Sequence, residues 1–171
     1  MLDLFRLVQL QEIAMKFSVV GCISILLGFL TTAVPAAMSQ EANAVSTLKV
    51  HITYSGSGTA DEKHKIYVVL WDTPAFVSGG AMPVEILPLA SKDGMVTFSD
   101  VKKSPAYVSA AFDPKGDWDA KSGPPPDGSS LGLYSKTPGK PEPIDIQPGK
   151  TASIEFSFDD SVKMQSGRPT R

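Results

Sequence analysis

Four aspartates that lie close together in the sequence are the residues of this chain best suited to bind a metal ion. Asp113, Asp117 and Asp119 follow one another at offsets of 0, 4 and 6, and Asp127 lies where the chain could fold back toward them. Calcium is a hard cation that prefers several oxygen ligands. Because a bound ion would also relieve the repulsion among these carboxylates, the spacing predicts a calcium site with a structural role.

The same aspartates also permit an interpretation without a metal. Lys115 occupies a position at which an EF-hand loop carries an oxygen ligand. Aspartate accepts hydrogen bonds from nearby backbone amides, and proline lacks an amide donor, so Asp113-Pro114-Lys115-Gly116 is typical of a turn that ends a strand. In this second interpretation the aspartates are turn formers that cap backbone N–H groups.

A third interpretation makes the acidic loop the active site of a hydrolase or isomerase, with Asp113, Asp117 and Asp119 beside Trp118. Two carboxylates divide acid and base roles only where their environments separate their pKa values. The sequence contains no Gly-x-Ser-x-Gly motif and no histidine next to a suitable serine. It therefore shows no set of residues suited to nucleophilic catalysis. The main interpretation is therefore a non-catalytic protein.

The histidines, the cysteine and a second acidic pair add little to the case for catalysis. His51 is expected on the water-facing side of a strand and His64 at the entrance of another, and neither has a second ligand at metal-binding spacing. The single cysteine, Cys22, lies in the N-terminal apolar run. Asp159 and Asp160 are adjacent, so on a strand they would point to opposite faces.

Three aromatic residues in expected loops, Phe76, Trp118 and Tyr134, are candidate contacts for a ligand or partner. Aromatic rings in loops stack on sugars or anchor a partner, although many only cover the end of a sheet. The chain has 16 Lys and Arg against 18 Asp and Glu, a net charge of −2. This balance gives no sign of a nucleic-acid partner, and a protein or glycan is expected instead.

The elements that must position these residues are strands. Residues 106–112 alternate between two faces and lead directly into the acidic loop, and residues 48–54 and 152–158 alternate in the same way. Ile66–Trp71 is apolar on both faces, which predicts a central strand covered on both sides. The expected strands are residues 48–54, 66–71, 84–89, 95–98, 105–112, 144–146 and 152–158.

About seven strands with turns between them predict an all-β fold, a single antiparallel β-sandwich over residues 46–160. Residues 84–98 are expected to form a hairpin, with its first strand at a sheet edge because of Pro83 and Pro88. Residues 122–143 are rich in proline and glycine and are expected to be a long loop, tied to the sandwich by residues 131–134. The polar tail is expected to be frayed from residue 159 and disordered over 161–171.

The N-terminal segment, residues 1–39, predicts export. An uncharged, mainly apolar run over residues 17–30 follows Lys16, and small residues precede Gln40, as in a secretory signal cleaved before Gln40. Residues 1–14 fit a signal poorly, so Met15 is the expected start. The protein is then periplasmic or secreted, without a stable membrane span. A retained anchor or a lipid on Cys22 are the alternatives.

The order of these motifs resembles a known family. Ile66–Trp71, Gly94–Phe98, Tyr107-Val108 and Phe112-Asp113 with its acidic loop are similar to a bacterial family of secreted domains of unknown function, over residues 46–160. Members of that family look like transthyretin-like or carboxypeptidase-regulatory-like sandwiches, which implies the same fold here. The family often has an Asp-x-Asn-x-Asn/Asp loop at this place. The chain lacks the Tyr-Arg-Gly-Ser-like tail of hydroxyisourate-hydrolysing relatives, so the resemblance implies no such enzyme.

Overall fold

The computed structural model describes residues 45–165 and 168–170, so the predicted signal over residues 1–39 lies outside the described residues. The described elements are β1 (Thr47–Tyr54), β2 (Ile66–Trp71), the 3₁₀ helix η1 (Pro74–Ser78), β3 (Glu85–Leu89), β4 (Asp93–Phe98), β5 (Tyr107–Phe112), β6 (Ser130–Leu133), β7 (Thr151–Phe158), β8 (Lys163–Gln165) and β9 (Arg168–Thr170). Among the described residues, no helix is long and apolar enough to cross a membrane.

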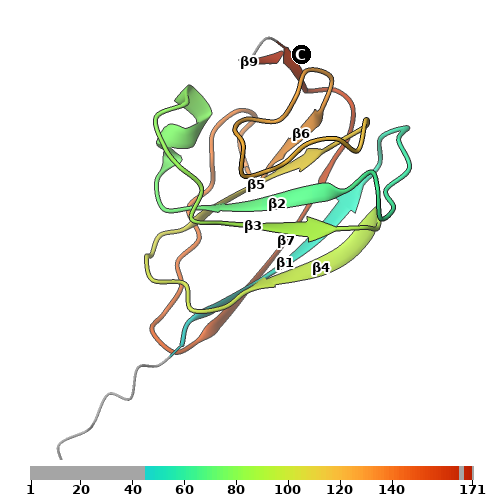
Figure 1. Ribbon diagram of the computed structural model, residues 1–171. Helices are drawn as coiled ribbons and strands as arrows, with labels where there is room; N and C mark the ends of the chain where they lie inside the picture. Colours follow the sequence, from blue (N-terminus) through green and yellow to red (C-terminus); the bar gives the residue numbers. More distant parts are fainter. Residues whose placement is uncertain (1–44, 166–167, 171) are drawn as a thin grey trace, which may run out of the picture. The chain divides into compact units, whose positions relative to one another are not determined.

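The strands form two packed sheets, and the predicted all-β sandwich is confirmed (Figure 1). One sheet has the order β4-β1-β7 and the other the order β3-β2-β5-β6-β8-β9. All strand pairs are antiparallel except β1 with β7, which run parallel, with Thr47 beside Thr151 and Tyr54 beside Phe158. The sandwich is therefore antiparallel with one parallel pair that joins its first and seventh strands.

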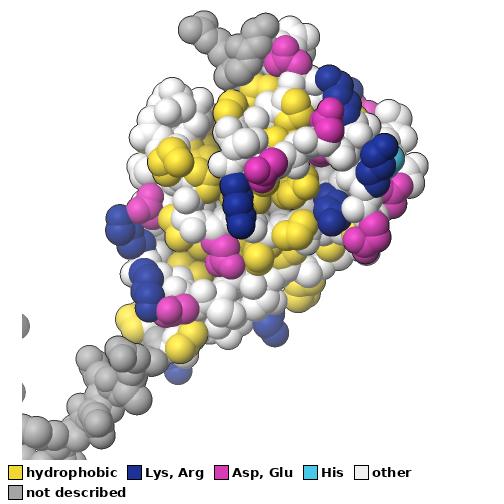
Figure 2. Space-filling view, viewed as in Figure 1, with side chains coloured by type: hydrophobic (Ala, Val, Ile, Leu, Met, Phe, Trp, Pro, Cys, Tyr) yellow, Lys and Arg dark blue, Asp and Glu magenta, His cyan; other side chains and the backbone are white. Residues whose placement is uncertain are grey.

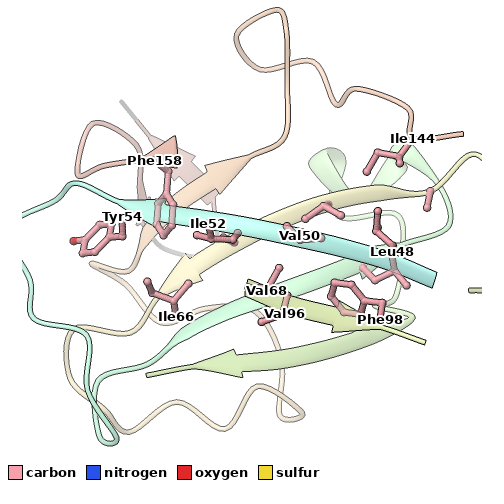
Figure 3. Close-up of a cluster of buried hydrophobic side chains, with 14 of the residues drawn as sticks. Leu48, Val50, Ile52, Tyr54, Ile66, Val68, Val96, Phe98, Ile144 and Phe158 are labelled. Carbon is pink, nitrogen blue, oxygen red and sulfur yellow. The ribbon is translucent and has the colours of Figure 1, made fainter. Parts of the chain in front are cut away.

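The core lies between the sheets and follows the alternation seen in the sequence. In β1, Leu48, Val50 and Ile52 are fully buried, while the residues between them face outward. Ile66 and Val68 of β2 meet them from the other sheet (Figure 3). Because successive side chains of a strand point to opposite faces, strict alternation here places one face in the core and the other outside.

The predicted hairpin over residues 84–98 is wrong. β3 pairs with β2, with Leu89 beside Ile66, whereas β4 pairs with β1, so the two strands lie in different sheets. Asp93 and Gly94, which lie between the two expected strands 84–89 and 95–98, are the first residues of β4. The expected edge position of β3 is confirmed, since it is the first strand of its sheet. A short connection between strands can cross from one sheet to the other, and local turn chemistry does not distinguish this from a hairpin.

Three further segments differ from the expectations. Residues 130–133 of the expected loop form β6, which pairs with β5. Residues 144–146 form no strand, and only Ile144 bridges to Ala106, although Ile144 and Ile146 are buried. The tail expected to be disordered contains β8, and Met164 in this strand is buried. The strand is held because the backbone of Met164 is hydrogen-bonded to the backbones of Gly128 and Ser129.

The strand directions place the connections at two opposite ends of the sandwich. The β1–β2, β3–β4 and β5–β6 connections lie at one end, called the Trp118 end because Trp118 is in the β5–β6 connection. The β2–β3 and β4–β5 connections lie at the other end, called the η1 end, where the chain also enters β1. The two groups of loops are thus separated by the length of the strands.

Candidate binding site around Trp118

The buried carboxylate of Asp113 fixes the loop that carries Trp118. Asp113 directly follows β5 and is 1% exposed. Its Oδ1 accepts the backbone N–H of Lys115 at 3.0 Å, and its Oδ2 accepts that of Trp118 at 2.8 Å. Its own N–H donates to the carbonyl of Lys65 at 3.0 Å. Asp113 is therefore a cap for its own loop, as the second interpretation of the sequence expects.

The other aspartates of the predicted calcium site face water. Asp117, Asp119 and Asp127 are exposed, and Asp119 Oδ1 accepts the backbone N–H of Lys121 at 3.0 Å. The described residues contain no group of three or more His, Cys, Asp or Glu side chains placed to hold a metal ion. The fold does not gather the four predicted ligands around one point, because Asp113 turns inward to backbone amides instead.

The hydrolase or isomerase interpretation finds no added support in this arrangement. Both oxygens of Asp113 are occupied by amides of its own loop, and Asp117 and Asp119 are at the surface. A general acid or base must reach the proton that it transfers. The enzyme interpretation stays a prediction.

Trp118 packs on the outer face of the larger sheet. Its ring meets that of Tyr67 in β2 edge to face, with centroids 4.7 Å apart and an interplanar angle of 72°. The Tyr67 hydroxyl donates to the carbonyl oxygen of Trp118 at 3.3 Å. Burial raises the pKa of Tyr67, and the nearby carboxylates of Asp113 and Asp119 raise it further. The indole Nε1–H of Trp118 is buried and has no hydrogen-bond partner among the described residues.

The β1–β2 connection packs closely against this loop. Gly116 has φ +67°, and a Cβ there would lie 2.7 Å from the carbonyl oxygen of Lys63. The position therefore requires glycine, for its conformation and for the close approach of the two backbones. Asp61 Oδ1 accepts the N–H groups of Lys63 and His64, and the His64 amide bond is the main reason that the pKa of Asp61 falls to about 2. Two capped loops thus support each other beside Trp118.

The three predicted contact aromatics are not brought together. Phe76 lies at the η1 end, where it stacks on Trp71 with ring centroids 4.6 Å apart. Tyr134 follows β6, and its ring centroid is 6.2 Å from that of Phe156 in β7. Trp118 packs on Tyr67 at the opposite end from Phe76. Each aromatic therefore covers a different part of the sandwich.

Reasoning from the sequence missed the strand residues that these loop aromatics contact. Tyr67, Val69 and Trp71 alternate on the outer face of β2, and Tyr107 of β5 lies beside Trp71. Val69 is buried, but Tyr67, Trp71 and Tyr107 are only half-buried, so β2 is not fully covered on both sides as predicted. Hydrophobic side chains and charged ones are both seen on the molecular face in Figure 2. The alternation of Tyr67, Val69 and Trp71 within residues 66–71 was the sequence signal that could have placed them on one face of the strand.

The outer face of the smaller sheet carries a shallow hollow of about 480 Å³. Its lining residues are Lys49, His51, Met95, Ser153, Ile154 and Glu155. His51 faces outward as predicted, but its Nε2 lies 3.0 Å from Asp93 Oδ1 and its Nδ1 lies 4.0 Å from Glu155 Oε2. These carboxylates come from β4 and β7, so spacing around His51 in the sequence could not reveal them.

Comparisons with known proteins give no family assignment. A scan against protein-family models, a search of curated proteins and a search of solved structures found no match. The two-sheet all-β fold is the part of the predicted resemblance that the structure supports.

Proposed function

We propose that this protein is an exported, non-catalytic binding module of the bacterial envelope, with Trp118 and Tyr67 at its contact surface. Three observations support the proposal. The sequence over residues 1–39 has the features of a secretory signal, the described residues form a sandwich whose loop carboxylates cap backbone, and a capped loop presents a half-buried tryptophan. The resemblance to secreted transthyretin-like and carboxypeptidase-regulatory-like domains points the same way.

The observation that carries this proposal is the unpaired indole N–H of Trp118. If the ring only covered Tyr67, phenylalanine would give a similar edge-to-face contact without burying a donor. An unsatisfied buried donor costs about 1–3 kcal/mol. Trp118 stands where phenylalanine would pack on Tyr67 without an unpaired donor, and we take the indole to serve a contact beyond its own fold.

The surroundings of the ring favour a glycan as the ligand. Trp118 is half-buried, and Asp117 and Asp119 on either side of it are exposed. An apolar ring face stacks on the C–H groups of a sugar, and carboxylates beside it accept hydrogen bonds from sugar hydroxyls. The half-buried Tyr67 adds a second ring at the same place.

The test uses the fact that the chain has two tryptophans. In a Trp71→Phe chain, Trp118 is the only indole, and its fluorescence should change in a saturable way when soluble peptidoglycan fragments are added. The Trp118→Phe chain should remain as stable as the parent chain or become more stable, yet recover less of its partner from envelope extract.

Two outcomes would contradict the proposal. Equal recovery of envelope components by the parent and Trp118→Phe chains would show that the ring is only a cover. Turnover of a substrate that is abolished by one substitution at Asp117 or Asp119 would establish the enzyme interpretation instead.

A further inference from the structure

We propose that the η1 end of the sandwich is a lipid-contacting surface, on which the β2–β3 connection enters the interfacial region of a bilayer. This inference goes beyond the binding module proposed above, because it concerns the opposite end of the molecule and a different partner.

The β2–β3 connection is uncharged and exposes apolar side chains. No charged residue occurs between Asp72 and Glu85. Within this stretch Val77 is 48% exposed, Met82 83% and Val84 53%. In Figure 2 the lobe that contains η1, at the upper left, is drawn in yellow and white. Burying these side chains in lipid would remove apolar surface from water without desolvating a charge.

Exposed apolar residues are concentrated at this end. Five large hydrophobic residues are exposed in the described part of the chain, and three of them, Val77, Met82 and Val84, belong to the β2–β3 connection. Of the other two, Val45 precedes β1 and Met95 lies on β4. Single exposed apolar residues are ordinary on soluble proteins, but three in one uncharged connection favour an interaction surface.

Part of the η1 backbone is hydrogen-bonded within its own segment. Thr73 Oγ1 accepts the N–H of Ala75 at 3.3 Å, and the N–H groups of Gly79 and Gly80 donate to the carbonyls of Phe76 and Ala75. Phe76 turns inward and stacks on Trp71, whereas Val77 points to the exterior. Each such bond lowers the cost of placing the segment in an environment poor in water.

The route of the chain relates the N-terminal segment to this end of the sandwich. The N–H of Val101 donates to the carbonyl of Ser46 at 2.9 Å, and Lys103 Nζ lies 2.6 Å from Asp72 Oδ2, so the entry to β1 connects through the β4–β5 connection to the base of the β2–β3 connection. The sequence before Val45, with its apolar run over residues 17–30, joins the sandwich at this end. If the run over residues 17–30 or a lipid on Cys22 is retained instead of being removed by cleavage before Gln40, the retained segment leads into β1 at this end.

The charges near the two ends of the sandwich also favour contact between the η1 end and an anionic bilayer. Lys102 and Lys103 at the η1 end are exposed and pair with Asp100 and Asp72. Exposed ion pairs contribute little to stability, so these lysines can turn toward lipid phosphates. In the connection at the Trp118 end, the exposed acids Asp117, Asp119 and Asp127 outnumber the exposed Lys115 and Lys121, so an anionic surface repels this end.

The two tryptophans report on the two ends separately. Trp71 contacts Phe76 of η1, and Trp118 lies at the opposite end. The full chain is added to vesicles made of equal amounts of phosphatidylethanolamine and phosphatidylglycerol with brominated acyl chains. Bromine quenches nearby indoles, so a Trp118→Phe chain, which keeps Trp71, should lose fluorescence, and a Trp71→Phe chain should not.

Substitution of the exposed side chains tests whether the connection itself makes the contact. Changing Val77, Met82 and Val84 together to serine should abolish quenching of Trp71, and each single change should lower vesicle partitioning by about tenfold or less. Met95→Ser is the matched control, because Met95 is 58% exposed on β4, and it should leave quenching unchanged.

Three outcomes would overturn the proposal. One is that the Trp118→Phe chain, with Val77, Met82 and Val84 unchanged, shows no quenching of Trp71. Another is that quenching persists in the triple variant, because the N-terminal run alone would then hold the chain at the vesicle. The third is concentration-dependent self-association that the triple variant loses while vesicles have no effect, which would identify a second copy of the chain as the occupant.

Discussion

Asp160 joins three segments of the sandwich through one carboxylate. Its Oδ1 accepts the hydroxyls of Tyr54 at 2.5 Å and Ser130 at 2.6 Å, and its Oδ2 accepts the N–H and the hydroxyl of Ser57. The Ser130 hydroxyl is the largest cause, and the Tyr54 hydroxyl the next, of a pKa of Asp160 well below the usual range. Asp159 instead bonds the N–H of Ser161, so the two adjacent acids are not a pair.

Asp160→Asn should therefore change how stability depends on pH. A carboxyl with a lowered folded-state pKa contributes stability that is complete above its unfolded value of about 3.9 and is lost as pH falls through the folded value. Asparagine keeps the size but replaces one acceptor oxygen with a donor. We expect the variant to be less stable by about 1–3 kcal/mol at neutral pH, and this difference to shrink below about pH 4.

Denaturant unfolding of both chains across the acid range measures this difference in unfolding free energy. Asp159→Asn is the neighbouring control and should have the smaller effect at neutral pH, since its carboxylate is exposed. A stability difference for Asp160→Asn that stays constant from neutral to acid pH would contradict the assignment.

Asp113 and Asp117 separate the capping interpretation from the calcium interpretation. Asp113→Ala removes the acceptor of two loop amides and should lower the free energy of unfolding by about 1–3 kcal/mol. Asp117→Ala removes an exposed carboxylate and should change it by less than about 0.5 kcal/mol. Thermal unfolding of both variants, in chelator and in calcium, makes the comparison. A loss at both positions that appears only in calcium would restore the predicted ion site.

At this scale the sequence allowed part of the site to be predicted. Asp113 as a turn former follows from the chemistry of Asp-Pro-Lys-Gly, which acts within a few residues. The partner of Trp118 could not be predicted in the same way, because Tyr67 lies in a different strand, 51 residues away in the chain. The same is true of the carboxylates beside His51, which β4 and β7 supply.

β6 shows how an element can be necessary to the fold and nearly invisible in the sequence. It is four residues long and contains Gly132, which lies against Phe158 of β7. A strand this short gives too few alternating positions to be recognised among neighbouring prolines and glycines. The hairpin predicted over residues 84–98 was wrong for another reason. The sheet that a strand joins depends on which of its faces buries the most apolar surface, and that is a property of the whole core.

Gly132→Ala tests the close packing of β6 on β7. A Cβ at this position would lie 2.6 Å from Cγ of Phe158, so the ring or the strand must shift. We expect a loss of about 1–3 kcal/mol, as for other overpacked sites. Gly80→Ala is the control, since its nearest neighbour would be at 3.5 Å. Equal midpoints of denaturant unfolding for the Gly132→Ala and parent chains would show that the contact between the sheets adapts without strain.

For the whole molecule, the fold class could be predicted because the strongest signals are repeated. β1 and β7 alternate over their whole lengths, and such alternation can bury one face only in a layered structure. The difference between the two ends of the sandwich was not predicted. An acidic, capped loop lies at one end and an uncharged, apolar connection at the other, and this can be recognised only once the strand directions are known.

The parallel pair of β1 and β7 also governs when the sandwich can form. Thr47 and Thr151 are partners, so the pair closes a loop of 151 − 47 = 104 residues. By the usual scaling, this closure costs about 4 kcal/mol of chain entropy in addition to a constant. Long-range pairing slows folding. Until the ribosome has synthesised β7, β1 lacks one of its two neighbours in the sheet. Such a delay would suit the export proposed above, in which the chain passes through a secretion channel before it folds.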